Sequence, residues 1–139
     1  MRRHAAIVML AILASDASAS PARPPGFALY SDVCYHRESG DILGTRVGIL
    51  NLPEASYAYV QFAEGSFAPP QLVKLEQDVD GLSFSAQVFA KGPASVFHGR
   101  ITGEILTGEF VDHAQGPSGK AKFNLQRIEA AESGYPDCR

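Results

Sequence analysis

The stretch FHGRITGEILTGEF, residues 97–110, decides the fold because it reads nearly the same in both directions. Glycine at the first position of a two-residue loop, here Gly103 before Glu104, suits a type II′ turn between antiparallel strands. Such a turn fixes the register, since residues equidistant from the loop lie opposite one another. The mirrored pairs on one face are Ile101 with Leu106, Gly99 with Gly108, and Phe97 with Phe110. The sequence therefore predicts a tight β-hairpin with an apolar face.

The pair formed by Gly99 and Gly108 leaves the middle of that face without side chains. We call this cross-strand pair the glycine rung. A pair without side chains allows a sheet to curl sharply, or allows another group to approach the backbone closely. Two interpretations follow. In the first, a side chain from the facing wall or coiling of the sheet fills the space. In the second, a ligand lies on the bare backbone, which makes both glycines candidate binding residues.

The rest of the chain alternates apolar and polar residues at every second position, which is typical of half-buried strands. The expected strands cover residues 27–36, with a bend near Ser31 and Asp32, and then 42–50, 56–65, 71–79, 82–89, the two arms of the hairpin, and 120–127. Eight short antiparallel strands, within a range of seven to nine, predict an all-β fold. We expect an up-and-down barrel, with a two-sheet β-sandwich as the alternative.

The first residues are typical of an export signal. Arg2 and Arg3 precede an apolar run, and small residues follow it. This pattern predicts a signal peptide over residues 1–19, because the run is shorter than the roughly 20 residues that span a bilayer. Residues 20–26 are a proline-rich lead that we expect to be flexible, and residues 27–139 form a single domain. We expect a protein of the periplasm or the extracellular space, without membrane insertion.

Two cysteines, Cys34 and Cys138, lie near the two ends of that domain. In an exported protein such a pair is expected to form a disulfide. It would close a loop of about a hundred residues, for which the chain-entropy model gives at most about 4.7 kcal/mol. The bridge would fasten the seam at which the barrel closes.

Charge and motifs exclude several classes of function. The 12 basic and 15 acidic side chains leave a net charge of −3, without the basic stripe of a nucleic-acid-binding protein. His36, His98 and His113 have acidic neighbours, with His98 expected opposite Glu109, but no histidine or cysteine spacing is typical of a metal site. No GxSxG elbow or phosphate loop occurs. We therefore expect no metal, no cofactor and no catalytic residues.

Tyr57, Tyr59 and Gln61 share one face of an expected strand. Tyrosines on an outer face provide rigid, hydrogen-bonding surface and are enriched at interfaces. Turned inward, the same residues would line a small cavity, and ordinary cross-strand packing is the third interpretation. These three residues are candidate binding residues of either kind.

The sequence thus predicts an exported, non-enzymatic binding domain. An eight-stranded barrel can hold one small ligand, so the first expectation is a small apolar molecule at the barrel mouth, above Gly99 and Gly108. The alternative is a protein partner, for example a secreted hydrolase that the domain inhibits through a patch including Tyr57 and Tyr59. The chain has no tryptophan, so it lacks the Gly-x-Trp signature of lipocalins and the ligand-holding tryptophans of avidin-like barrels.

Overall fold

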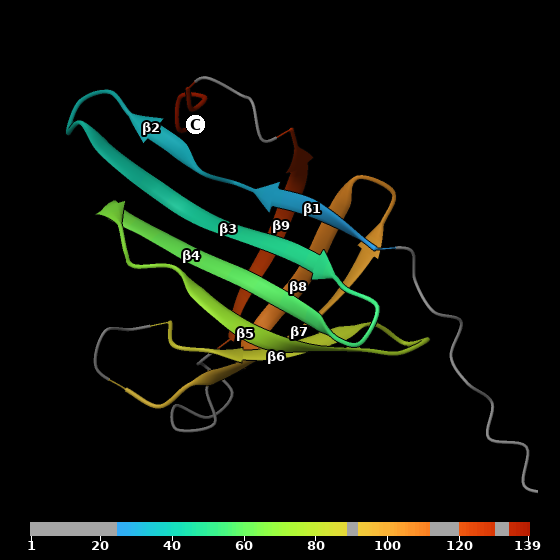
Figure 1. Cartoon of the computed structure of the whole chain (residues 1–139). Coiled ribbons are helices and arrows are strands. Elements are labelled where there is room, and N and C mark those ends of the chain that lie inside the picture. Colours follow the sequence, from blue (N-terminus) through green and yellow to red (C-terminus); the bar gives the residue numbers. More distant parts are fainter. Residues whose placement is uncertain (1–24, 89–91, 112–119, 130–133) are drawn as a thin grey trace, which may run out of the picture.

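The protein is a closed antiparallel barrel of eight strands with one additional strand, as the sequence predicted, and not a sandwich. The computed structural model describes residues 25–88, 92–111, 120–129 and 134–139 (Figure 1). These parts contain β1 (Gly26–Ser31), β2 (Cys34–His36), β3 (Asp41–Asn51), β4 (Ser56–Phe67), β5 (Gln71–Gln77), β6 (Leu82–Ala86), β7 (Ser95–Thr102), β8 (Ile105–Val111) and β9 (Lys120–Ile128). Sheet order runs β1-β9-β8-β7-β6-β5-β4-β3-β2, and β1 also pairs with β3, which closes the ring.

Helices are absent from the described residues, and none of these residues therefore belongs to a helix long and apolar enough to cross a membrane. The predicted signal peptide, residues 1–19, lies outside the described residues. So do residues 20–24 of the proline-rich lead, and the barrel begins at Gly26.

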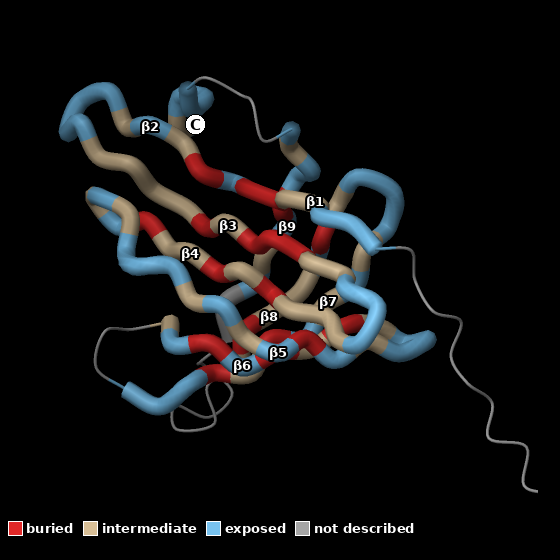
Figure 2. The backbone as a smooth tube through the Cα atoms, viewed as in Figure 1, coloured by how far each residue is buried: buried red, intermediate tan, exposed pale blue. Residues whose placement is uncertain are grey.

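Buried residues alternate with more exposed ones along the strands (Figure 2), because successive side chains of a strand point to opposite faces and one face lies in the barrel interior. On β6, Leu82, Phe84 and Ala86 are buried, whereas Ser83 and Ser85 point outward. The buried core consists of Tyr30, Val47, Ile49, Ala58, Val60, Leu75, Leu82, Phe84, Ala86, Phe97, Leu106, Phe110 and Leu125. Burial of one large side chain of this kind stabilises the fold by about 1.5–3 kcal/mol, so the interior is the main source of stability.

The hairpin of β7 and β8 has the predicted register. Thr102 lies opposite Ile105, and the pairing continues through the glycine rung to Phe97 opposite Phe110. The φ angle of Gly103 is 60°, and no described residue other than glycine has a positive φ. A positive φ at the first loop position alone is the mark of a type II′ turn, so the turn type is confirmed as well.

The first predicted strand is interrupted where the sequence indicated a bend. β1 ends at Ser31, β2 begins at Cys34, and both pair with successive parts of β3. The Asp32 carboxylate accepts a hydrogen bond from the Thr45 backbone N–H at 2.6 Å, which replaces a strand-to-strand bond at the break. The chain here passes so close to Gly44 that a Cβ on this glycine would lie 2.8 Å from Val33 Cα. The absence of a side chain at position 44 therefore permits the bend.

The turn between β5 and β6 differs from the prediction. The expected strands 71–79 and 82–89 leave a two-residue loop at Asp80 and Gly81, a common hairpin pair, but β5 ends at Gln77 and Val79 is 90% exposed. The reason is Asp78, whose carboxylate accepts hydrogen bonds from the backbone N–H groups of Asp80 and Gly81 at 2.8 and 2.9 Å. Such an Asx turn competes with strand pairing, and it places Val79 at the tip.

The predicted disulfide between Cys34 and Cys138 is present, with a Cα–Cα distance of 4.9 Å. The bond lies on β2, beside the β1–β9 seam rather than across it. Further contacts hold the last residues against β2. Tyr35 donates its backbone N–H to Pro136 O and accepts one from Cys138, at 2.8 and 3.0 Å. The bridge therefore anchors the C-terminal segment, residues 134–139, to the additional strand.

Removal of the disulfide tests its contribution to stability. The double substitution Cys34→Ala with Cys138→Ala removes the cross-link and so raises the conformational entropy of the unfolded chain. The loss of a native disulfide typically costs about 2–5 kcal/mol of unfolding free energy. We expect the free energy of unfolding, measured by urea titration, to fall by that amount. Treatment of the unaltered protein with a reductant should give the same loss, and an unchanged free energy in both experiments would contradict this role.

A pH dependence follows from Tyr30, whose side chain is only 3% exposed. Burial raises the pKa of this phenol above its ordinary value of 10.0, Arg127 opposes the shift, and Glu104 adds to it. The folded protein therefore holds the proton more tightly than the unfolded chain. Its contribution to stability is complete below about pH 10 and is lost as the pH rises through the folded pKa.

The substitution Tyr30→Phe keeps the ring and removes the ionisable hydroxyl. We expect the free energy of unfolding of this variant to decline less steeply above about pH 10 than that of the unaltered protein. Urea titrations at a series of pH values measure the two slopes. Identical slopes would show that Tyr30 does not control alkaline unfolding.

Candidate functional site

Tyr57, Tyr59 and Gln61 lie on the outer face of β4. Their neighbours Ala58 and Val60 are completely buried and point into the barrel. Tyr59 donates its hydroxyl hydrogen to Gln61 Oε1 at 2.9 Å, and Gln61 Nε2 donates to Ala68 O at 3.1 Å. The structure therefore brings Tyr59 and Gln61 together and holds both side chains in fixed positions. The sequence allowed these side chains to point either inward or outward, and in the structure they point outward.

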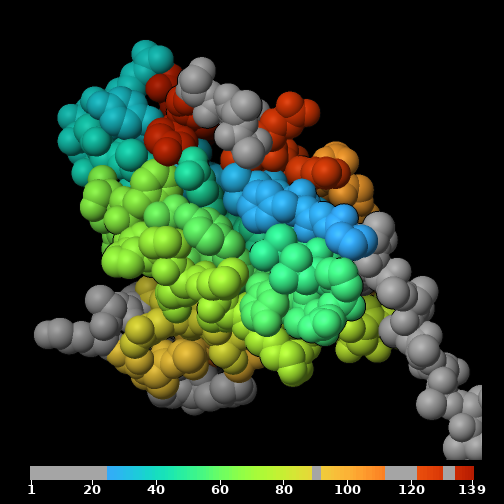
Figure 3. All heavy atoms as spheres, viewed as in Figure 1, coloured from blue at the N-terminus to red at the C-terminus, as the bar shows by residue number. Residues whose placement is uncertain are grey.

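These tyrosines belong to a larger apolar surface, which we call the aromatic wall. It consists of Phe27, Leu50, Tyr57, Tyr59 and Leu72, on the outer faces of β1, β3, β4 and β5. The blue, teal and green segments that contain these strands lie side by side on the face seen in Figure 3. Cross-strand neighbours form the aromatic wall, because Phe27 lies opposite Leu50, Leu50 opposite Tyr57, and Tyr59 opposite Leu72. Phe27 is 52% and Leu72 is 64% exposed. An apolar group of this kind on an outer face is typical of an interaction site.

A glycine gives the aromatic wall its flat centre. A Cβ on Gly48 would lie 2.7 Å from Phe27 Cε2 and 3.3 Å from Tyr59 Cβ. The Phe27 ring therefore covers the backbone of Gly48 and extends the wall from β1 toward β4. A larger residue at position 48 would displace the ring outward, so this glycine is part of the surface although it has no side chain.

The opposite outer surface is polar. A row of cross-strand neighbours crosses β6 to β9, in which Ser83 faces His98, His98 faces Glu109 as predicted, and Glu109 faces Lys122. Polar groups of this kind remain solvated and contribute little to binding or stability. The barrel thus has two chemically different outer sides, and the aromatic wall occupies one of them.

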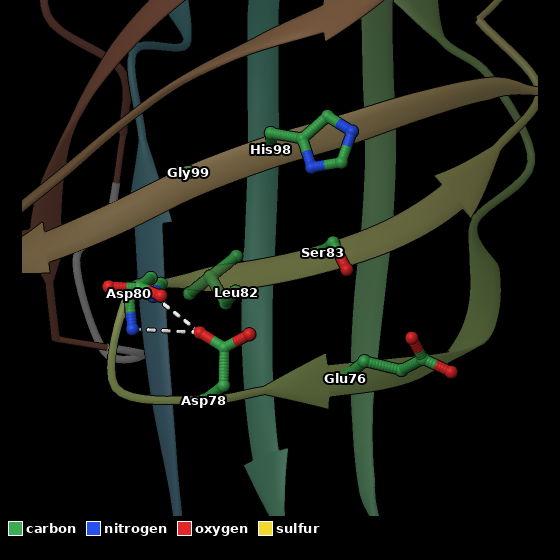
Figure 4. Close-up of a pocket in the computed structure, with 8 residues that line it drawn as sticks. Glu76, Asp78, Asp80, Leu82, Ser83, His98 and Gly99 are labelled. Atoms are coloured by element: carbon green, nitrogen blue, oxygen red, sulfur yellow. Dashed lines mark hydrogen bonds between the residues drawn. The ribbon is translucent and has the colours of Figure 1, made fainter.

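A shallow groove of about 170 Å³ lies beside this polar row, lined among others by Glu76, Asp78, Ser83 and His98 (Figure 4). A histidine near a serine and carboxylates is the arrangement that acyl-transfer catalysis requires. Here Asp78 turns toward the backbone of Asp80, and no hydrogen bond joins Ser83, His98 and Glu76. No group of three possible metal ligands occurs among the described residues. The groove therefore offers no assembled catalytic or metal site.

Of the other two histidines, His36 is among the described residues and does not line this groove. His36 lies on β2, and its Nδ1 is 3.1 Å from Ser39 Oγ. His113 lies outside the described residues.

The space over Gly99 and Gly108 is occupied by the ring of Phe97. A Cβ on Gly99 would lie 2.4 Å from Phe97 Cε1, and one on Gly108 would lie 2.3 Å from Phe97 Cζ. The same ring stacks on Phe84, with centroids 4.7 Å apart, and is fully buried. The neighbouring residue of the same strand thus fills the bare rung, rather than a side chain from the facing wall. Ligand binding on the inner side of these glycines stays a prediction and would require this ring to move, whereas on the outer side Gly99 also lines the groove of about 170 Å³.

A third cluster was not predicted from the sequence. The guanidinium of Arg46, on β3, lies over the rings of Phe67 and Tyr135, 4.8 and 5.1 Å from their centroids. The rings contact each other at 5.7 Å. Beside them is a groove of about 660 Å³, lined partly by the C-terminal segment. The signal in the sequence is a charged residue, Arg46, in the middle of a strand whose other central residues are uncharged.

Comparisons with protein-family models, with curated proteins and with solved structures found no match to this chain. Its function must therefore be inferred from the surfaces described above.

The glycine rung can be tested by substitution. Gly108→Ala places a methyl group where Phe97 lies, and overpacking of this kind typically costs about 1–3 kcal/mol of unfolding free energy. Gly92→Ala is the matched control, because a Cβ there meets no atom within 4 Å. We expect the first variant to be destabilised in urea titrations and the second to be unaffected. Equal stability of both variants would indicate that the Phe97 ring does not occupy the rung.

Proposed function

We propose that this protein is an exported binding module that docks a partner protein on the aromatic wall. The observation that carries the proposal is the contrast between the two outer sides of the barrel. Phe27 and Leu72 are each more than half exposed on one side, whereas the opposite row is polar. A sheet that required only solubility would carry polar residues on both outer sides.

The composition of the aromatic wall supports a protein partner. Tyrosine is enriched among the residues that dominate interface energies, because it combines a large contact area with a hydrogen-bonding hydroxyl. Tyr59 is already held by Gln61, so little side-chain entropy would be lost on binding. Lys74, opposite Tyr57 on β5, and Gln61 provide polar neighbours at the border. An apolar centre with a polar rim is the usual anatomy of an interface.

Export to an oxidising compartment is the second part of the proposal. The disulfide between Cys34 and Cys138 is compatible with that location, since such bonds rarely persist in the cytosol. The arginine-led apolar run at the start of the sequence points the same way. The periplasm or the extracellular space is therefore the proposed location, where a secreted hydrolase that the domain inhibits is one kind of partner.

The aromatic wall is favoured over the barrel interior as the binding site. A small apolar molecule above Gly99 and Gly108 would have to displace a fully buried ring that stacks on Phe84. Removal of such a ring from a packed core costs several kcal/mol. A partner on the outer wall needs no such rearrangement.

Two single substitutions test the proposal. Leu72→Asp places a charge in the aromatic wall, where it would be desolvated by a partner. Val79→Asp is the matched control, because Val79 is an exposed aliphatic residue outside the wall. We expect the unaltered protein and Val79→Asp to retain the same protein from an extract of exported proteins. Leu72→Asp should retain at least tenfold less of it, as quantified by mass spectrometry.

Equal retention by all three proteins would contradict docking on the aromatic wall. Because both substituted side chains are largely solvent-exposed in the free protein, we expect either change to alter the free energy of unfolding by no more than about 0.5 kcal/mol. Urea titration of each variant excludes misfolding as the cause of a lost interaction.

A further inference from the structure

Arg46 is a cation without a hydrogen-bond acceptor among the described residues. Three other arginines have one. Arg37 binds Asp137 through Nε at 2.7 Å, Arg100 donates to Asp80 O at 2.9 Å, and Arg127 pairs with Glu104 at 3.3 Å. The guanidinium of Arg46 lies over the rings of two aromatic residues, and its Nε is buried without a partner among the described residues. The least solvated of these guanidinium groups is therefore the one that lacks an acceptor.

The aromatic contacts orient this guanidinium without using its donors. A ring face attracts the positive charge, but the five N–H groups lie in the guanidinium plane and still require acceptors. The rings come from two distant elements, Phe67 at the end of β4 and Tyr135 in the C-terminal segment. The disulfide and the backbone bonds of Tyr35 hold that segment in place. The donors of Arg46 are thus preorganised beside the groove of about 660 Å³.

Arg46 is also continuous with the aromatic wall. It lies opposite Gln61 on the outer face, and the next outward pair along the same two strands is Gly48 opposite Tyr59. Gln61 in turn accepts the hydrogen bond from Tyr59. A molecule that covers the wall would therefore reach Arg46 without crossing another element.

We propose that Arg46 binds a carboxylate, supplied by an aspartate or glutamate side chain of the partner protein. This inference rests on the proposed function, since it names a group that the partner presents. Arginine and a carboxylate form two parallel hydrogen bonds in one plane, which matches a guanidinium oriented by aromatic contacts. Asp32, Glu129 and Asp137 also line the groove, and Arg139 is its second arginine. The three acidic side chains disfavour a phosphate more than a carboxylate, because a phosphate carries the larger negative charge.

The site can be tested without the partner. In the ¹⁵N-labelled, disulfide-bonded protein, the Nε–Hε resonance of Arg46 is assigned as the signal that Arg46→Lys removes. We expect benzoate to shift this resonance in a saturable manner in the millimolar range, at least tenfold more tightly than the neutral isostere benzamide. Arg100→Lys, a matched change on the opposite outer side, should leave the titration unchanged. An unmoved resonance, or equal effects of the two probes, would overturn the site.

Two further titrations test which anion binds and whether Arg46 is free to bind it. Inorganic phosphate should give no saturable shift, and a site that saturates with phosphate but not with benzoate would overturn the choice of carboxylate. Glu132 lies outside the described residues, and Glu132→Gln should leave the benzoate titration unchanged. If benzoate binds only to the Glu132→Gln variant, the Glu132 carboxylate already pairs with the Arg46 guanidinium in the unaltered protein, and the proposal is overturned.

The failure of this inference is distinguishable from failure of the docking surface. Leu72→Asp should not change the benzoate titration, because it alters the aromatic wall and not the guanidinium. Arg46→Met should reduce retention of the partner at least tenfold while urea titration shows a folded protein. If benzoate binds but Arg46→Met retains the partner fully, the partner supplies no carboxylate at this site.

Discussion

The ring of Phe97 is the contact on which the rest of the molecule depends. It fits only because Gly99 and Gly108 stand opposite each other with no side chain, so that the ring can lie against backbone on two strands at once. In this position it stacks on Phe84 and meets Phe110 edge-on, with centroids 5.1 Å apart. A barrel of eight strands has an interior just wide enough for side chains or one small ligand. The aromatic cluster occupies that interior, and for this reason the proposed binding site is on the outer surface.

The strand register also determines which side chains lie next to each other on the outer surface. Each strand pair fixes which residues point outward together, so Phe27, Leu50 and Tyr57 align across three strands on one side. The same rule aligns Ser83 and His98 on the other side. One-residue slippage in any pair would exchange inner and outer faces and would destroy both the core and the aromatic wall. The packing of the interior and the chemistry of the exterior are therefore consequences of one set of pairings.

Most of the fold could be predicted from the sequence, because it depends on local patterns. Alternation identified the strands, Gly103 indicated the hairpin and its turn type, and the two cysteines indicated the bridge. The exception is instructive. Asp80 and Gly81 are a common turn pair, but Asp78 forms a local hydrogen-bonded turn that ends β5 early and exposes Val79. Within residues 78–81, the hairpin turn expected at Asp80 and Gly81 competed with the hydrogen-bonded turn formed by Asp78. The sequence alone does not show which of the two turns is more stable.

The candidate site was predictable only in part. The shared face of Tyr57, Tyr59 and Gln61 follows from alternation, but its direction depends on which side of β4 is more apolar when the barrel closes. Phe27 and Leu72 join the aromatic wall through pairings between separate strands. The cluster at Arg46 lay beyond prediction, because one of its rings is near the C-terminus and reaches β3 only through the folded tail.

The position of the disulfide connects these parts. A bond meant only to close the barrel would be expected across the β1–β9 seam, yet Cys138 is joined to β2, which lies outside the closed ring. The bond holds residues 134–139 along β2, and that segment places Tyr135 beside Phe67 and Arg46. A preorganised side chain loses less entropy when it binds. The same covalent bond thus restricts the unfolded chain and fixes the orientation of Arg46, whose buried Nε has no acceptor in the described parts of the protein.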